Sequence, residues 1–523
     1  MSPRLCNRGM RGILAKPPYC LRVGYSTTRQ LVSRKLSITA SYNTPRSKVI
    51  HELARYVGKS PINLQSNGVD KNGYGAAILA SRDFTTWLDD ESFMSTILET
   101  LFRSTRNGGQ ANPLHIDVLA GVVDGISSND LLGEPQAGFS ILYGQTENIL
   151  PDLWDGESLS LQATGESGTA SIRFAMNPLE GDIRPLELTL PLANTVFQNG
   201  RQSTLSATRW ESSPQGPITL KAANHKSTQS IFAYGDLANH TSSHIPLLPV
   251  TPPRKVIAGL GNIVRQVEVD GSATPASREL EVLIPKILDF RSKRHATASS
   301  GPVGVWCWVI PAHVAEAKKL FDVKILSIES LQSDSEAELA EKSIKVFSEL
   351  LSAGCRLHKI LSGGGGWGLK QGLLSLDPET HFSLPGEDEG DIEMFIKSFQ
   401  ERESANSSEG IVTPGSYIMF CIEPQWTEQA TAAGRNAANS SSTQTLSLGV
   451  APHGDFAPSV SASTDNEVTV IGGHFGATSA AGLFLRMIPE LPGISMKADT
   501  NKPLQPFTTK VDVPKAYFRT GDV

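Results

Sequence analysis

The sequence has little cysteine and no apolar run long enough to cross a membrane. Its 523 residues include five cysteines, all far apart, so neither a disulfide framework nor a paired zinc-ligand spacing is present. Cys307, Cys355 and Cys421, which lie beyond the first 20 residues, are expected to be buried thiols. The best apolar stretch, residues 303–315, is shorter than the ~18 residues that a spanning helix needs, and Pro311 interrupts it. We therefore expect no membrane span.

Recognisable catalytic signatures are also missing. The chain contains no Gly-x-Ser-x-Gly elbow, no protein-kinase signature set and no His-Glu-x-x-His motif. Their absence argues against the enzyme classes that these motifs identify from sequence alone. It leaves open whether the protein is an enzyme, and it names neither a cofactor nor a metal.

The amino terminus lacks acidic residues, the first being Glu52. An arginine-rich and serine-rich segment without acid is typical of a mitochondrial transit peptide, which we predict over residues 1–47. Cleavage is expected near Tyr25, or later, before about Lys48. The alternative is a disordered basic arm that binds nucleic acid. Residues 1–50 contain ten basic residues: Arg4, Arg8, Arg11, Lys16, Arg22, Arg29, Arg34, Lys35, Arg46 and Lys48.

Removal of these ten residues makes the rest of the chain strongly acidic. The whole sequence carries 47 basic and 53 acidic residues, so 37 basic residues remain against 53 and the net charge becomes −16. Nucleic-acid affinity comes largely from lysine and arginine on phosphates. The charge therefore argues against direct nucleic-acid binding and favours an imported matrix protein.

The hydrophobic pattern predicts an α/β fold (mixed α+β), with two α/β halves and an antiparallel β-rich module between them. Strands at 74–80 and 115–123 with a helix at 92–102 between them indicate a βαβ unit. Short alternating segments separated by turn residues over 157–235 indicate the β-rich module. Four segments are expected: a transit peptide or disordered arm over 1–47, an α/β segment with the β-rich module over 48–240, a Pro-rich linker and helix over 241–300, and a C-terminal α/β half with a glycine-rich loop over 301–523.

Four consecutive glycines, residues 363–366, follow an apolar segment and precede Trp367 and Lys370. Such a run is worth its entropic cost only where the chain turns tightly or approaches something closely. It is not a P-loop, because Leu369 stands where that motif requires lysine and Pro378 follows soon after. Successive glycine amides with Lys370 nearby are typical of an anion-binding nest. The alternative is a tight, packed turn.

Two weaker patterns have simpler interpretations. Residues 259–264 resemble the start of a dinucleotide fingerprint, but Val264 replaces the third glycine, so we expect a helix that begins near Asn262. Two sets of residues are candidate metal ligands. Cys355 and His358 would lie one helical turn apart. His453, Asp455 and His474 are expected on loops, and they would bind one metal only if these loops converged. Zinc takes three or four ligands, so these histidines are expected to be polar loop residues.

A second glycine turn, Gly472-Gly473-His474, directly follows an apolar strand predicted at 468–471. Ligands of open α/β sheets bind in crevices at strand ends, so the two glycine turns are expected to line one crevice. The candidate ligand-binding residues are Gly363, Gly364, Gly365, Gly366, Trp367, Lys370, Gly472, Gly473 and His474.

Two resemblances add to this interpretation. The acid-free amino terminus, the glycine-rich stretch of residues 361–378 and the segment 191–210 are similar to a fungal family of mitochondrial proteins without an assigned activity. In its order of strands and helices, the region of residues 74–143 resembles the amino-terminal half of FIST sensory domains. That resemblance implies binding of a small ligand.

Three functional hypotheses follow. The leading one is a soluble mitochondrial matrix protein that binds a ligand or acts as an assembly factor in a mitochondrial protein complex. The second is an enzyme that acts on a small anionic ligand at the glycine-rich loop, with Lys370 and His474 as contributors. The third is a factor in mitochondrial gene expression that associates with the mitoribosome.

Overall fold

The computed structural model describes residues 33–59, 73–103, 114–127, 134–155, 169–179, 182, 184–212, 216–233, 240–294, 303–317, 325–326, 336–363, 372–383, 411–425, 444–452, 467–487 and 507–521. Strands make up 46% and helices 24% of the structure. Most strand pairs are antiparallel, and the parallel pairs among the described strands are β2 with β3, β5 with β9 and β19 with β21. The fold is therefore mixed and mainly β, and the predicted α/β class is only partly correct.

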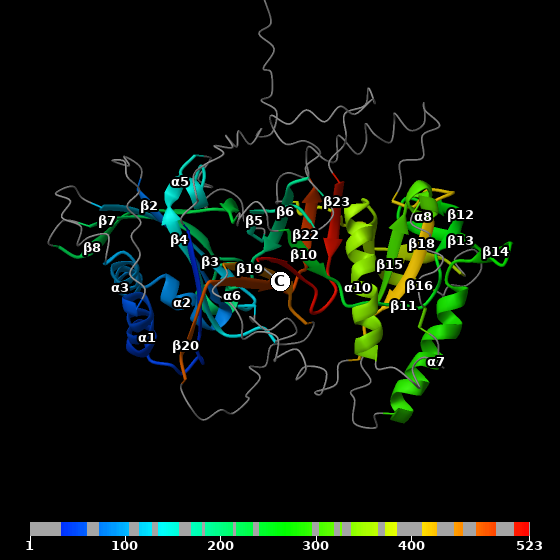
Figure 1. Ribbon diagram of the computed structural model, residues 1–523, viewed down its shortest axis with the longest axis horizontal. Helices are drawn as coiled ribbons and strands as arrows, with labels where there is room; N and C mark the ends of the chain where they lie inside the picture. The colour runs from blue at the N-terminus through cyan, green and yellow to red at the C-terminus, as the bar shows by residue number, and fades with distance from the viewer. Residues whose placement is uncertain are drawn as a thin grey trace, which may run out of the picture.

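A seven-stranded sheet, ordered β20-β1-β4-β2-β3-β7-β8, forms the left part of the molecule in Figure 1. Strands β2 and β3 are parallel neighbours with α3 between them in sequence, which confirms the predicted βαβ unit. Helices α1 and α3 cover one face of the sheet. The strands are β1 (Arg34–Thr39), β2 (Tyr74–Ser81), β3 (Leu114–Val123), β4 (Gly138–Gln145), β7 (Leu205–Ser212), β8 (Ile218–His225) and β20 (Thr469–Gly472); the helices are α1 (Arg46–Lys59) and α3 (Glu91–Leu101).

Local sequence explains both helices. In α1, Val49, Leu53 and Val57 recur at helical spacing and are buried against the sheet. Asp90 begins α3 by accepting hydrogen bonds from the Ser92 hydroxyl and from the backbone N–H groups of Phe93 and Ser92, and these bonds lower the pKa of its carboxyl to about 2. Short helical segments lie at η1 (Arg82–Phe84), α2 (Thr85–Leu88), α5 (Thr146–Ile149) and α6 (Val196–Asn199).

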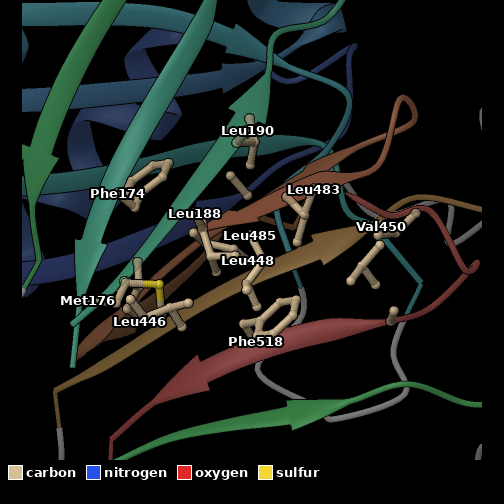
Figure 2. Packing of buried hydrophobic residues seen from close by; sticks show 14 of the residues in the cluster. Phe174, Met176, Leu188, Leu190, Leu446, Leu448, Val450, Leu483, Leu485 and Phe518 are labelled. Carbon is tan, nitrogen blue, oxygen red and sulfur yellow. The ribbon is translucent and has the colours of Figure 1, made fainter. Parts of the chain in front are cut away.

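A five-stranded sheet (β23-β22-β6-β5-β9) and a four-stranded sheet (β10-β24-β19-β21) occupy the centre of the molecule. Figure 2 shows their shared core, where Phe174 and Leu188 of the first sheet meet Leu448 and Phe518 of the second. The strands are β5 (Ser171–Met176), β6 (Leu186–Pro191), β9 (Thr228–Phe232), β10 (Thr241–His244), β19 (Thr445–Val450), β21 (His474–Ser479), β22 (Leu483–Met487), β23 (Phe507–Val511) and β24 (Tyr517–Thr520).

An eight-stranded sheet at the right of Figure 1 contains a closed barrel of six strands. Strand β18 pairs with both β12 and β15, which closes the order β12-β13-β17-β16-β15-β18. The strands are β11 (Leu248–Pro249), β12 (Arg254–Leu260), β13 (Ile263–Val269), β14 (Ser272–Pro275), β15 (Val305–Ile310), β16 (Arg356–Gly363), β17 (Leu374–Leu376) and β18 (Tyr417–Ile422).

The barrel corrects the prediction of a helix from Asn262. Residues 254–269 form a β-hairpin instead, in which Leu260 pairs with Ile263. Gly261 takes φ +61° at the turn, a conformation that glycine adopts readily and that suits a two-residue hairpin. The glycines of this segment therefore serve a turn, and no strand-to-helix dinucleotide motif is present there.

Three helices accompany the barrel and the central sheets: α7 (Arg278–Arg294), α8 (Ala312–Ala317) and α10 (Glu336–Ser352). Phe347 of α10 stacks on Trp308 of the barrel with ring centroids 5.5 Å apart. Gly354 follows α10 with φ +80°, which is how many helices end. None of the helices in the described ranges is long and apolar enough to cross a membrane.

Residues 34–39 require a correction of the predicted transit peptide. They form β1, which lies between β20 and β4 in the seven-stranded sheet and buries Leu36 and Ile38 completely. The folded part therefore begins well before residue 47. Six of the basic residues precede residue 33, which leaves 41 basic residues against 53 acidic ones and a net charge of −12.

The sheets also join strands from distant parts of the sequence. Strand β1 pairs with β20, β6 pairs with β22, and β10 pairs with β24. Each of these pairs links the first half of the chain to the last 60 residues. The proposed boundaries at 240 and 300 therefore cut across sheets.

Candidate functional site

The predicted site residues lie in two places. Gly363 is the last residue of β16 and is exposed on the barrel. Gly364, Gly365, Gly366, Trp367 and Lys370 lie outside the described residues, so the predicted crevice shared by both glycine turns stays a prediction. Gly472, Gly473 and His474 lie together where β20 ends and β21 begins.

Gly473 makes the corner between two sheets. Strand β20 pairs with β1 of the seven-stranded sheet, whereas β21 runs parallel to β19 of the four-stranded sheet. Gly473 has φ +73°, and its N–H donates to the carbonyl oxygen of Lys35 at 2.8 Å. A Cβ on Gly472 would lie 1.7 Å from the Tyr56 hydroxyl oxygen. Gly473 is therefore required by the backbone conformation and Gly472 by the close approach of Tyr56, and the corner places His474 against β1.

His474 is 2% exposed and belongs to a buried chain of hydrogen bonds. Its Nδ1 lies 2.9 Å from Ser37 Oγ, and Ser37 Oγ lies 2.9 Å from Ser140 Oγ. Ser140 donates to the carbonyl oxygen of Gly476 at 2.7 Å and accepts from the N–H of the same residue at 3.1 Å. These bonds fix the imidazole between the two sheets.

Ser37 Oγ lies within hydrogen-bond distance of three groups: His474 Nδ1, the His474 carbonyl oxygen at 3.2 Å, and Ser140 Oγ. Ser37 has one hydroxyl proton to share among them, so His474 Nδ1 donates to Ser37 in one neutral tautomer and accepts from it in the other. Among the described residues the buried His474 Nε2 has no hydrogen-bond partner.

Two basic side chains lie near the imidazole. Lys35 is two residues before Ser37 on β1, so both side chains point to the same face of that strand. Arg519 of β24 is in register with Ser447 of β19, which is in register with Gly476 of β21, two residues after His474. We call the group formed by Lys35, Ser37, Ser140, His474 and Arg519 the polar seam.

Burial dominates the electrostatics of the polar seam. Burial, together with the positive charges of Arg519 and Lys35, lowers the pKa of His474 to about 4. Burial also lowers the pKa of Lys35 to about 8 and lowers that of Arg519. Lys35 is 4% exposed, and within the described part of the chain its ammonium makes no ion pair. The seam thus holds desolvated positive charge beside a neutral imidazole.

This arrangement suits binding of an anion better than nucleophilic catalysis. Ser37 and His474 form a serine–histidine pair, with Ser37 Oγ 2.9 Å from His474 Nδ1. Ser37 is completely buried and hydrogen-bonded, and no carboxylate among the described residues orients the imidazole. An anion beside Lys35 would restore the solvation that burial removes from this ammonium.

A second buried histidine, His358, lies on β16 close to where the glycine-rich loop begins. Its Nδ1 donates to the carbonyl oxygen of Asp377 at 2.7 Å, and burial lowers its pKa. Lys510 forms ion pairs with Asp377 and Glu379 across the same region. Cys355, its proposed ligand partner, is a buried thiol before β16. Among the described residues no group of three metal-ligating side chains is present, and His453 and Asp455 lie outside those residues.

A surface hollow of about 310 Å³ is lined by Thr146, Glu147 and residues 150–155. Three acidic residues, Glu147, Asp152 and Asp155, belong to this lining. Their charge has the wrong sign for the predicted anionic ligand. The polar seam therefore remains the better candidate for that ligand.

The sequence indicated His474 but not the residues around it. Lys35 and Ser37 were counted as part of the transit peptide, although Lys-Leu-Ser-Ile-Thr (residues 35–39) alternates polar and apolar residues as a half-buried strand does. Ser140 and Arg519 carry no local signal, because only the pairing of distant strands brings them to His474. No protein-family model, curated protein or solved structure matches the chain.

Proposed function

We propose that this chain is a ligand-binding protein of the mitochondrial matrix that holds a small anion in the polar seam. Lys35 carries the proposal, because it is a buried cation without an ion-pair partner in the described part of the chain. A lysine left in this state lowers the stability of the fold. A functional ligand is the simplest reason to keep it there.

The neighbouring groups suit the same ligand. Arg519 adds a second positive charge that acts on His474, and His474 itself stays neutral at pH 7. An anion bound there gains Coulomb energy in a region of low dielectric constant, where charge pairs are stronger than in water. The resemblance of residues 74–143 to FIST sensory domains, which implies a small ligand, supports this proposal.

A binding titration tests the proposed site. Inorganic phosphate added to the full chain should raise its melting temperature in a saturable way, because a ligand that binds only the folded state stabilises it. The variant Lys35→Met should lose this response. Lys59→Met removes the same charge from an exposed position in the last turn of α1 and should keep it. An equal response from all three proteins would contradict the proposal.

The acid-free amino terminus supports the mitochondrial part of the proposal. A fluorescent fusion of the full chain should accumulate in mitochondria, and a fusion that begins at residue 33 should stay in the cytosol. Cytosolic fluorescence from both fusions would make the localisation wrong without affecting the proposed binding site.

A further inference from the structure

The surface hollow beside α5 is a cavity that the polar seam does not use. Its volume of about 310 Å³ lies at the lower end of the range of ~300–1,000 Å³ that is usual for small-molecule sites. Leu150 and Leu153, both largely buried, and the indole ring of Trp154 form the apolar part of its lining. The hollow therefore has the size and the apolar surface to hold a small organic molecule.

Side chains from the turn between β8 and β9 hold the wall of the hollow in place. The Lys226 ammonium donates to the Leu153 carbonyl oxygen at 2.5 Å, and the Gln229 amide donates to the Pro151 carbonyl oxygen at 2.8 Å. A ligand that enters the hollow meets a loop that is already ordered. Such an ordered loop lowers the entropic cost of binding.

The ring of Trp154 is fixed as well. Its indole N–H donates to Asp117 Oδ1 at 2.9 Å. Arg209, which also pairs with Asp117, places its guanidinium carbon 4.7 Å from the centroid of the ring. These contacts from β3 and β7 keep the aromatic part of the lining in one orientation.

The charge of the lining is negative. Glu147, Asp152 and Asp155 are exposed carboxylates of the hollow. Burial lowers the pKa of the nearby Lys226, and Asp155 and Asp152 oppose this shift, so both carboxylates act on its ammonium. Three carboxylates against this one ammonium leave a surplus of two negative charges.

The carboxylates are not arranged to chelate an inorganic cation. Within the described ranges, no group of three histidine, cysteine, aspartate or glutamate side chains is placed to hold a metal ion. Separated negative charges around an apolar surface suit a ligand whose positive charges are also separated.

We propose that this hollow binds an aliphatic diamine, a small molecule with two ammonium groups joined by a methylene chain. The ammonium groups would donate charged hydrogen bonds to the carboxylates, and the methylenes would lie against the apolar lining. A neutral molecule would leave the surplus charge unbalanced, and an anion would be repelled. This site is separate from the polar seam, so it stands or fails independently of the proposed function.

Isothermal titration calorimetry on the full chain at pH 7 tests the proposal with 1,5-diaminopentane as the probe. The matched compound is 1,5-pentanediol, which has the same chain length and no charge. Exposed ion pairs contribute up to about fivefold each, so the diol should bind more than about tenfold more weakly than the diamine. The affinity for the diamine should also fall as sodium chloride is added.

A pair of double variants shows whether the hollow is the site. Asp152→Asn with Asp155→Asn should weaken diamine binding about tenfold, and asparagine tolerates the φ of +53° at residue 152. Asp270→Asn with Asp289→Asn removes two exposed carboxylates elsewhere, one of them at a similar φ of +50°, and should leave the affinity unchanged. Melting temperatures verify that both variants fold.

Four results would overturn the proposal. They are an absence of diamine binding, equal binding of the diol, an equal loss in both double variants, and calcium chloride binding as tightly as the diamine. The last result would identify the hollow as a metal site instead.

Discussion

At the scale of single residues, Lys35 has the most direct energetic consequence. Its pKa falls from 10.5 to about 8, which means that folding disfavours its charged form. The destabilisation caused by the buried charge disappears as the pH rises from 8 to 10.5, because Lys35 then loses its proton in the folded chain before it does so in the unfolded chain. At pH 7 the penalty is present in full and amounts to about 3 kcal/mol at most.

The variant Lys35→Met should therefore be more stable than the unaltered protein when no ligand is present. Methionine keeps the apolar stem and removes the buried charge, so we expect a gain of about 1–3 kcal/mol in the free energy of unfolding at pH 7. Urea denaturation measures this gain. A loss of stability would mean that an unrecognised partner already holds the ammonium.

The lowered pKa of His474 predicts that the folded chain loses stability in acid. Its folded pKa of about 4 is lower than the ordinary value of 6.5, so the unfolded chain binds the proton first as the pH falls. Stability should decline between pH 6.5 and pH 4, by about 3 kcal/mol from this residue when the decline is complete. His244, with a pKa also lowered to about 4 by burial, should add a similar decline.

The variant His474→Gln should remove about half of this acid-sensitive part, as measured by urea unfolding at pH 7 and pH 4. His51→Gln makes the same substitution at an exposed histidine and serves as the control. If His474→Gln unfolds with the same pH profile as the unaltered chain, His474 is not the buried neutral histidine described above.

At the scale of elements, the corner between β20 and β21 creates the polar seam. Gly473 has a positive φ of +73°, which costs a residue with a side chain about 1 kcal/mol. Gly261 has φ +61° at a hairpin tip with open space around it, far along the chain from the seam. Both glycines adopt a left-handed backbone conformation, so alanine should destabilise the fold by a similar amount at either position.

Gly473→Ala and Gly261→Ala should each lose about 1 kcal/mol of unfolding free energy. Only Gly473→Ala should also weaken phosphate binding, because it moves His474 relative to Ser37 and Lys35. The comparison is made by titration calorimetry on both variants. Equal phosphate affinities would show that the corner does not position the seam.

Strand β1 predicts where the removable amino terminus ends. A chain that begins at residue 33 keeps the strand, whereas one that begins at residue 40 exposes the edges of β4 and β20 and loses Lys35 and Ser37. We expect the first to match the full chain within about 1 kcal/mol and the second to lose cooperative unfolding. Circular dichroism during thermal denaturation distinguishes the two. Cooperative unfolding of the shorter chain would make β1 dispensable.

The elements that the sequence predicted correctly are those whose own pattern determines them. The helix at 92–102 and the strands at 74–80, 115–123 and 468–471 have strong hydrophobic patterns of their own, and each is present to within one residue at either end. A helix was predicted from Asn262, after the dinucleotide fingerprint had been rejected because of Val264, whereas residues 254–269 form a hairpin. Strand β1 was missed because its basic composition matched a transit peptide. The seam itself follows from contacts between distant strands, such as those of Ser37 with His474 and of Ser140 with Gly476, which no local pattern records.

At the scale of the whole molecule, one apolar core connects the sheets. The largest buried cluster contains Leu79 of β2, Phe174 of β5, Trp308 of β15 and Phe518 of β24. Strands of the first half also need β20, β22 and β24 as partners. Folding of the two halves should therefore be coupled.

A fragment of residues 33–244 should fail to unfold cooperatively on its own. Its strands β1, β6 and β10 would each lack a neighbour and expose apolar side chains to water. Co-expression with residues 245–523 should restore a single transition at the position seen for the intact chain. Independent cooperative unfolding of the fragment, measured by calorimetry, would instead support the boundary predicted at residue 240.

The most direct test of the polar seam as an anion site is a crystal structure of the full chain soaked with arsenate. Arsenate resembles hydrogen phosphate and can be located by its anomalous scattering. We predict an anomalous peak between Lys35 and His474, with arsenate oxygens within about 3 Å of Lys35 Nζ and His474 Nε2. A seam that holds only water, or an arsenate bound solely elsewhere, would contradict the proposed site.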